Sequence, residues 1–134
     1  MGTDDRQTFP RSLRITTTRQ FQTVYDAGVS TNVGPLRVHG RPNDLGHPRL
    51  GMAVSRRVGN AVVRNRNKRL LREAFRLVQH DLPGEYDLVI SVRPHEPLRL
   101  DDYRNLLLDA ARRLDGIWNK RQRRDNRERP PNRG

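Results

Sequence analysis

The chain has 134 residues and a formal net charge of +12, from 27 lysines and arginines against 15 acidic residues. This length supports one domain with a modest core, and the charge favours nucleic acid or an anionic surface as the partner. The absence of cysteine excludes disulfides, thiolate zinc ligation and a cysteine nucleophile. No apolar run approaches the roughly 20 residues of a membrane span, and the N-terminus lacks a signal-peptide core. We therefore expect a cytoplasmic protein with no membrane partner.

Both ends of the chain are poor in apolar residues. Hydrophobic residues make up 33% of the whole, which is low for a fully folded domain. The first eleven residues lack periodicity, and the last sixteen are basic and contain two successive prolines. We predict a flexible N-terminal arm over residues 1–11, a folded domain over residues 12–118 and a basic disordered tail over residues 119–134.

The first predicted element is a short amphipathic helix. Threonines at positions 16–18 offer an N-cap. Apolar side chains then recur at i, i+3 and i+4, at Phe21, Val24 and Tyr25, and Gly28 ends the helix.

A strand region follows, in which Leu36 and Val38 alternate with polar neighbours. Residues 40–48 are rich in glycine, proline, asparagine and aspartate, which is typical of the loop of a hairpin. Residues 49–55 alternate between large apolar side chains and small ones. The small face would let a helix or a ligand approach the sheet closely.

The stretch from Ser55 to Arg76 is predicted to turn at Gly59 and to continue as one helix capped by Asn60. At about 100° per residue, one broad face carries Arg64, Lys68, Arg69, Arg72 and Arg76. The opposite arc, expected in the core, carries Val63, Leu70, Leu71, Ala74, Leu77 and Val78, with Phe75 at its edge. A solvated charged face usually mixes both signs, whereas this helix has Glu73 as its one acid. We interpret the face as a polyanion-binding surface.

Residues 86–93 form the strongest predicted strand. A third helix, capped by Asp101, carries apolar residues at helical spacing: Tyr103, Leu107, Ala110, Leu114 and Ile117 or Trp118. The element order is helix, three strands, helix, strand, helix (αβββαβα). It predicts a single α+β domain with a four-stranded mixed sheet on which the helices pack.

The start of the central helix has the features of a phosphate site. Backbone N–H groups at positions 61–63, the positive helix end and the neighbouring Arg56 and Arg57 would act together. Lys68 and Lys120 are the only lysines, and arginine's planar fork suits structured RNA. The alternative is a solvated basic face whose arginine stems cover apolar surface.

Other candidate sites have ordinary structural explanations. Phe21 and Tyr25 could be core residues or could stack on bases. The four histidines are scattered singly, and Asp101 with Asp102 fits a helix start, so we predict no metal site. No nucleophile–base order or Gly-rich phosphate loop stands out, which favours an accessory role over catalysis by the protein itself.

The order of residues in the central stretch identifies a protein family more specifically than its composition does. VSRRVGNAVVRNR (residues 54–66) and KRLLREAFR (residues 68–76) resemble the signature of the bacterial ribonuclease P protein subunit, with Arg64-Asn65-Arg66 as its RNR motif. The resemblance covers residues 12–118. It implies a protein that binds a large catalytic RNA and helps it remove the 5′ leader of precursor tRNA. It also implies a left-handed βαβ crossover, against the usual rule.

The resemblance also implies a set of site residues. The expected contacts with the catalytic RNA and nearby substrate are Arg56, Arg57, Asn60, Arg64, Asn65, Arg66, Lys68, Arg69 and Arg72. The expected leader cleft lies between the first helix and the sheet, lined by Phe21, Tyr25 and His39, where His39 replaces a frequent aromatic. Asn67 replaces a usual aliphatic residue and falls in the apolar arc, so it needs a hydrogen-bond partner if it is buried.

Three functional hypotheses remain open from the sequence. The first is the ribonuclease P protein subunit, without catalytic residues or a protein-bound metal of its own. Its partners would be the catalytic RNA and precursor tRNA, with Mg²⁺ implied in the complex and no protein partner required. The second is a non-enzymatic RNA-binding protein, such as a ribosomal or assembly factor. The third is a nuclease that acts without RNA.

Overall fold

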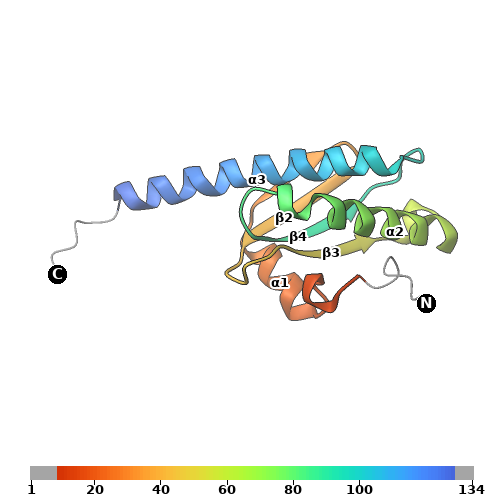
Figure 1. Ribbon diagram of the computed structural model, residues 1–134, viewed down its shortest axis with the longest axis horizontal. Helices are drawn as coiled ribbons and strands as arrows, with labels where there is room; N and C mark the ends of the chain where they lie inside the picture. The colour runs from red at the N-terminus through yellow and green to blue at the C-terminus, as the bar shows by residue number, and fades with distance from the viewer. Residues whose placement is uncertain (1–8, 129–134) are drawn as a thin grey trace.

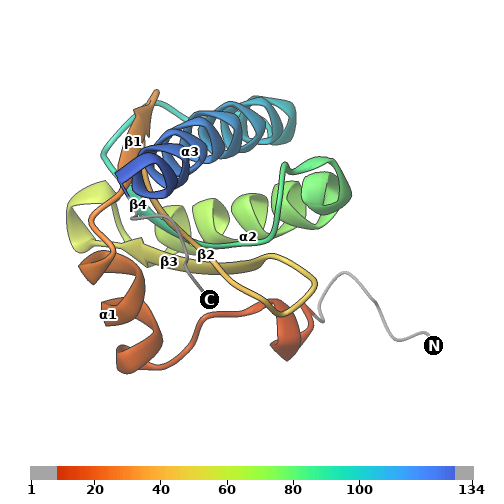
Figure 2. The same cartoon turned by 90° about the vertical axis from the view of Figure 1, so that its left-hand side faces the viewer.

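The computed structural model describes residues 9–128 and has an α+β architecture, as predicted (Figure 1). Helices α2 and α3 cover one face of a four-stranded sheet, and α1 lies on the other face (Figure 2). The elements are the 3-10 turn Arg11–Leu13, α1 (Thr18–Asp26), β1 (Ser30–Val33), β2 (Leu36–Pro42), β3 (Arg49–Val54), the 3-10 turn Arg56–Val58, α2 (Ala61–Val78), the 3-10 turn Gln79–Asp81, β4 (Tyr86–Val92) and α3 (Leu100–Glu128).

The strand order is β1-β2-β4-β3, so the predicted hairpin around residues 40–48 is wrong. The last strand, β4, lies between β2 and β3, antiparallel to the first and parallel to the second. All residues from Tyr86 to Ile90 are buried, which is typical of a central strand. The true hairpin joins β1 to β2 through Gly34, which has a positive φ of 51°. Helix α2 is the crossover between the parallel strands β3 and β4, and its handedness stays a prediction.

The main core lies between the sheet and the pair α2 and α3. It is built from alternate residues of β2 and β4 with the inner faces of the two helices: Leu36, Val38, Leu88, Ile90, Leu71, Ala74, Phe75, Val78, Tyr103, Leu107, Ala110 and Leu114. Gly40 allows this close packing, because a Cβ there would lie 2.9 Å from Leu114 Cδ1.

The buried face of α2 is narrower than the helical wheel predicted. Leu71, Ala74 and Phe75 are fully buried, so Phe75 is central and not at the edge. Val63 and Leu77 are 41% and 39% exposed. Both lie at the same margin of the buried arc, on the side away from Phe75. Arginine stems on the neighbouring face are left to cover part of this surface.

Asn67 is buried, and its hydrogen-bond partner is Tyr103 of α3. The Tyr103 hydroxyl donates to Asn67 Oδ1 at 2.7 Å. His95 Nε2 lies 2.8 Å from the same hydroxyl, and His95 Nδ1 lies 2.7 Å from the Arg93 carbonyl. This chain of polar groups joins α2, α3 and the segment that follows β4, so the departure at Asn67 is structurally compensated.

The folded part of the chain extends beyond both predicted limits of the domain, residues 12 and 118. Phe9, assigned to the flexible arm, is buried, and its ring packs edge-on against Phe75 at 5.8 Å between centroids. Helix α3 continues to Glu128, so the predicted disordered tail is helical over residues 119–128. Residues 1–8 and 129–134 lie outside the described part. Asp102, and not Asp101, accepts a hydrogen bond from the backbone N–H of Arg99 at the start of α3.

The Asn67–Tyr103 pair gives a first testable prediction. Tyr103→Phe leaves the buried Asn67 amide unpaired and is expected to lower the free energy of unfolding by about 1–3 kcal/mol. Adding Asn67→Leu removes the second polar group and is expected to recover most of this loss. Urea unfolding of both single variants and the double variant measures the coupling. Simple additivity of the two losses would contradict the assigned bond.

Candidate nucleic-acid interface

The start of α2 is built as predicted. Asn60 caps the helix, and its Oδ1 accepts from the backbone N–H of Val63 at 3.0 Å. Gly59 has φ 154°, and a Cβ there would lie 2.9 Å from Val63 Cβ, so a side chain does not fit. The preceding 3-10 turn leaves Arg56 and Arg57 exposed beside the positive end of the helix.

Four cations of α2, Arg64, Lys68, Arg69 and Arg72, share one face and lack acidic partners among the described side chains. Arg64, Lys68 and Arg72 follow at i, i+4 and i+8, and each is partly exposed, while Arg69 is exposed. Within residues 9–125, whose side chains the structure describes, no carboxylate lies within ion-pair distance of these four side chains. Arg76 of the same helix pairs with Glu73. The predicted cationic face is therefore present and open.

Arg66 departs from the rest of the motif. Its Nη2 donates to the Leu98 carbonyl at 3.0 Å, so this guanidinium holds α2 to the segment before α3. Asn65 and Asn60 are exposed on the helix. The structure thus gives Arg66 a structural contact, and its expected contact with RNA stays a prediction.

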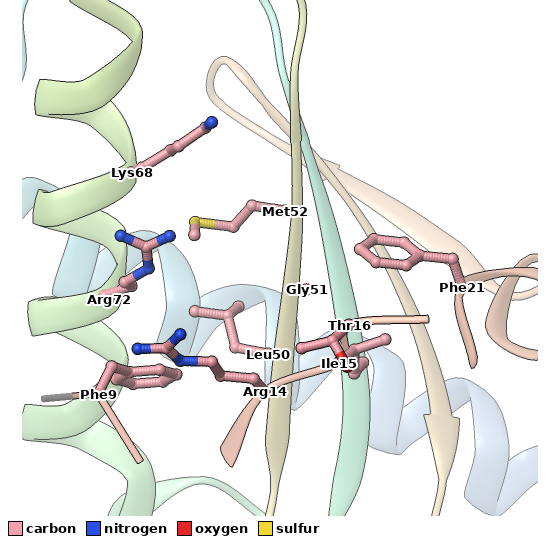
Figure 3. A pocket seen from close by; sticks show the side chains of 10 residues that line it. All are labelled: Phe9, Arg14, Ile15, Thr16, Phe21, Leu50, Gly51, Met52, Lys68 and Arg72. Carbon is pink, nitrogen blue, oxygen red and sulfur yellow. The ribbon is translucent and has the colours of Figure 1, made fainter. Parts of the chain in front are cut away.

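A groove of about 190 Å³ crosses the edge strand β3 and joins the two faces of the molecule (Figure 3). Lys68 and Arg72 of α2 lie on one side with Arg14, while Phe21 of α1 lies on the other side of the β3 ribbon. The remaining lining residues are Phe9, Ile15, Thr16, Leu50, Gly51 and Met52. The groove therefore connects the cationic face of α2 with the expected leader cleft.

Arg14 is a cation of this groove that the sequence analysis missed. Burial lowers the pKa of Arg72, and the nearby positive charge of Arg14 adds to this effect. Arg14 Nε is buried without a hydrogen-bond partner, and Arg14 Cζ lies 5.8 Å from the Phe9 ring centroid. Among the described side chains no carboxylate pairs with Arg14 or Arg72, so the two guanidiniums could bind an anion together. A signal for Arg14 exists in the sequence, because apolar and charged side chains alternate at Leu13, Arg14 and Ile15 as in a strand.

The α1 face of the sheet brings Tyr25 and His39 together. Their rings meet edge to face with centroids 4.9 Å apart. His39, Val89 and Gly51 form one row across β2, β4 and β3. Phe21 packs at the Gly51 end, where a Cβ would lie 2.9 Å from Phe21 Cζ. Phe21 and Tyr25 are both partly exposed, so each has ring surface free for a ligand.

Within residues 9–125, whose side chains the structure describes, no group of three histidine or acidic side chains is placed to hold a metal ion. No helix within residues 9–128 combines the length and apolar character needed to cross a bilayer.

The fold and its cationic groove define a small α+β protein that presents an arginine-rich helix beside aromatic side chains. The sequence profile of the family described as Ribonuclease P matches residues 9–115. The chain belongs to the ribonuclease P protein family, whose members are protein components of that endoribonuclease of tRNA processing.

Individual relatives agree with this assignment. A ribonuclease P protein component from Photobacterium profundum is 36% identical over 116 residues, covering 86% of this chain and 92% of the relative. One from Escherichia coli is 38% identical over 113 residues, covering 84% and 89%. The structure of the Thermotoga maritima RNase P protein superposes with a TM-score of 0.67 at 30% identity, covering 75% of this chain and 96% of that one. The Staphylococcus aureus protein gives 0.63 at 32%, covering 73% and 91%.

His39 gives a prediction about pH. Burial, and then the charge of Arg37, lower the pKa of His39, and its Nδ1 is buried without a partner. As the pH falls through about 6.5, the unfolded chain takes up the proton first. The contribution of His39 to stability is therefore complete above that pH and decreases below it.

When the pH is lowered from about 7.5 to about 5.5, we expect the free energy of unfolding to decrease less in His39→Phe than in the unmodified protein. Urea unfolding at both pH values measures the difference, and exposed His80→Gln is the control. An unchanged pH dependence in His39→Phe would show that the site does not disfavour the charged ring.

Proposed function

We propose that this chain is the RNA-binding subunit of ribonuclease P and acts in the cytoplasm with a catalytic RNA to remove the 5′ leader of precursor tRNA. The family assignment supports the enzyme. The RNA partner is supported by the cations of α2 that have no acidic partner among the described side chains, Arg64, Lys68, Arg69 and Arg72. Guanidiniums without internal acids are free to exchange counterions for phosphates, which is the main source of affinity for RNA.

The face of α2 is the surface proposed for the catalytic RNA. The start of the helix offers its remaining free backbone N–H groups and the positive end of the dipole to one phosphate. Successive turns then offer forked donors along the helix. The proposed contacts are Arg56, Arg57, Asn60, Arg64, Asn65, Arg66, Lys68, Arg69 and Arg72.

The leader is proposed to lie along α1, starting at the groove over β3. Lys68, Arg72 and Arg14 would hold its phosphates at one end. Beyond β3, Phe21 and then Tyr25 with His39 offer ring surface on which unpaired bases stack, whatever their sequence. The wall formed by His39 is neutral and polar at its ring edge, since burial disfavours its charged form.

The chemistry is proposed to belong to the RNA and its Mg²⁺ ions, which supply activated water and stabilise the leaving oxygen. The role of the protein's own cations is to lower the repulsion between phosphates that the folded RNA and its substrate bring together. Protein side chains then substitute for part of the diffuse Mg²⁺ that RNA alone requires.

The holoenzyme gives the direct test of this proposal. Adding the protein to the catalytic RNA is expected to lower the Mg²⁺ concentration needed for cleavage, and to tighten binding of precursor tRNA more than binding of mature tRNA. Cleavage assays over a Mg²⁺ titration and binding assays with both tRNAs measure this. No change in either quantity would reject the proposal. Recovery of the protein with ribosomal subunits would favour the second hypothesis.

Arg64 tests the role of the α2 face. Arg64→Ala removes a partly exposed cation that has no acidic partner among the described residues. We expect its affinity for the catalytic RNA to fall about fivefold at physiological salt, and the salt dependence of log K to decrease by about one. Arg112→Ala, an exposed arginine on α3, removes the same charge and is the matched control. An equal loss of affinity in both variants would show that net charge alone, and not the position of Arg64, explains the effect.

A further inference from the structure

The C-terminal part of α3 projects beyond the body of the protein as a basic helix (Figure 1). The match to the family profile ends at residue 115, so residues 119–128 lie beyond the region that the profile matches. The last large core residue of α3 is Leu114, and Trp118 packs partly against the core. Core packing therefore does not explain why the helix continues for ten further residues.

The base of this extension is anchored to the body. Trp118 Nε1 donates to the Gly40 carbonyl at 2.9 Å. Arg121 lies over the Trp118 ring, 5.2 Å from its centroid, and its Nη1 lies 3.4 Å from the carbonyl of Ala27 at the end of α1. These contacts fix the direction in which the extension leaves the body.

The cations beyond this anchor are exposed on one side of the helix. Lys120, Arg123 and Arg124 fall within about 100° of arc, and Asp125 lies at least about 100° away from each. All three cations are exposed, and no carboxylate of the described side chains pairs with Lys120 or Arg124. An open hollow of about 340 Å³ is lined by Ile117, Lys120, Arg121 and Arg124. Such a surface is complementary to a polyanion.

The extension lies at the α1 end of the proposed leader path. The contact between Arg66 and Leu98 places the first half of α2 level with the start of α3. Lys120 to Arg124 lie 20–24 residues further along α3, which is about 30–36 Å at 1.5 Å per residue. Along α1, in contrast, Tyr25 is only two residues from Ala27, which Arg121 touches.

Single-stranded RNA following α1 would therefore meet three features in order. These are the cations of the groove over β3, the rings of Phe21 and Tyr25, and the cations of the extension. We propose that the α3 extension binds phosphates of the distal part of the leader, after the leader has passed Tyr25. This inference rests on the proposed function and adds to it a contact that depends on leader length.

The test compares two leader lengths in the reconstituted holoenzyme. Precursor tRNAs with leaders of about 4 and about 16 nucleotides bracket the site sizes of single-strand-binding folds. Lys120→Gln/Arg124→Gln keeps good helix formers and removes two positive charges. Arg104→Gln/Arg112→Gln removes two exposed charges earlier on the same helix and is the matched control. Circular dichroism confirms that helix content is unchanged.

We expect the extension variant to bind the long-leader precursor about tenfold more weakly at physiological salt, with a salt slope reduced by about 1.4, which corresponds to two single-strand phosphate contacts. Binding of the short-leader precursor is expected to stay within about twofold of the unmodified holoenzyme. The control variant is expected to leave both affinities unchanged.

Two outcomes would overturn the inference. An equal loss of affinity for both precursors would indicate that the extension binds the catalytic RNA. Unchanged affinity for both would show that the extension does not contribute to binding. Failure of the proposed function has a different signature: the unmodified protein would then not favour precursor over mature tRNA at any leader length.

Discussion

The burial of one face of α2 between the sheet and α3 holds the whole cationic surface in place. Leu71, Ala74, Phe75 and Val78 occupy the core side, so the rotation of the helix about its axis is determined by packing. Arg64, Lys68 and Arg72, one turn apart, then lie along the border of the buried face, where Lys68 and Arg72 line the groove beside β3. Interiors are close-packed and resist rotation, which keeps these side chains at constant spacing without contacts among themselves.

Among the described side chains, the acids form their ion pairs with other arginines and leave Arg64, Lys68, Arg69 and Arg72 without one. Asp87 binds Arg49 through both carboxylate oxygens, and Asp109 pairs with Arg113 on α3. On the groove side, by contrast, Arg14 and Arg72 lie close enough for one charge to lower the pKa of the other. Repulsion of this kind is unfavourable in the free protein and is relieved by an anion. The distribution of carboxylates thus separates structural arginines from those available to a ligand.

Much of the fold could be predicted from local signals, and the failures share a physical cause. The cap at Asn60, the stop at Gly28 and the element order depend on nearby residues, and all are confirmed. The pairing of β2 with β4 depends on a contact distant in sequence, which turn composition at residues 40–48 does not encode. For the site, the α2 face was predictable from periodicity. Arg14 was not, because its position beside Arg72 exists only once the N-terminal segment pairs with β3 at Leu50.

Two glycines on opposite faces of the sheet control how closely the helices approach it. Gly40 admits Leu114 of α3, and Gly51 admits Phe21 of α1. At Gly51 the Phe21 ring packs against the backbone of β3, and the rest of the ring surface stays partly exposed. A side chain in its place would lift Phe21 and widen the space next to β3. The depth of the groove therefore depends on Gly51, which contributes no side chain. The small residues of β3 are as much a part of the site as the arginines that line it.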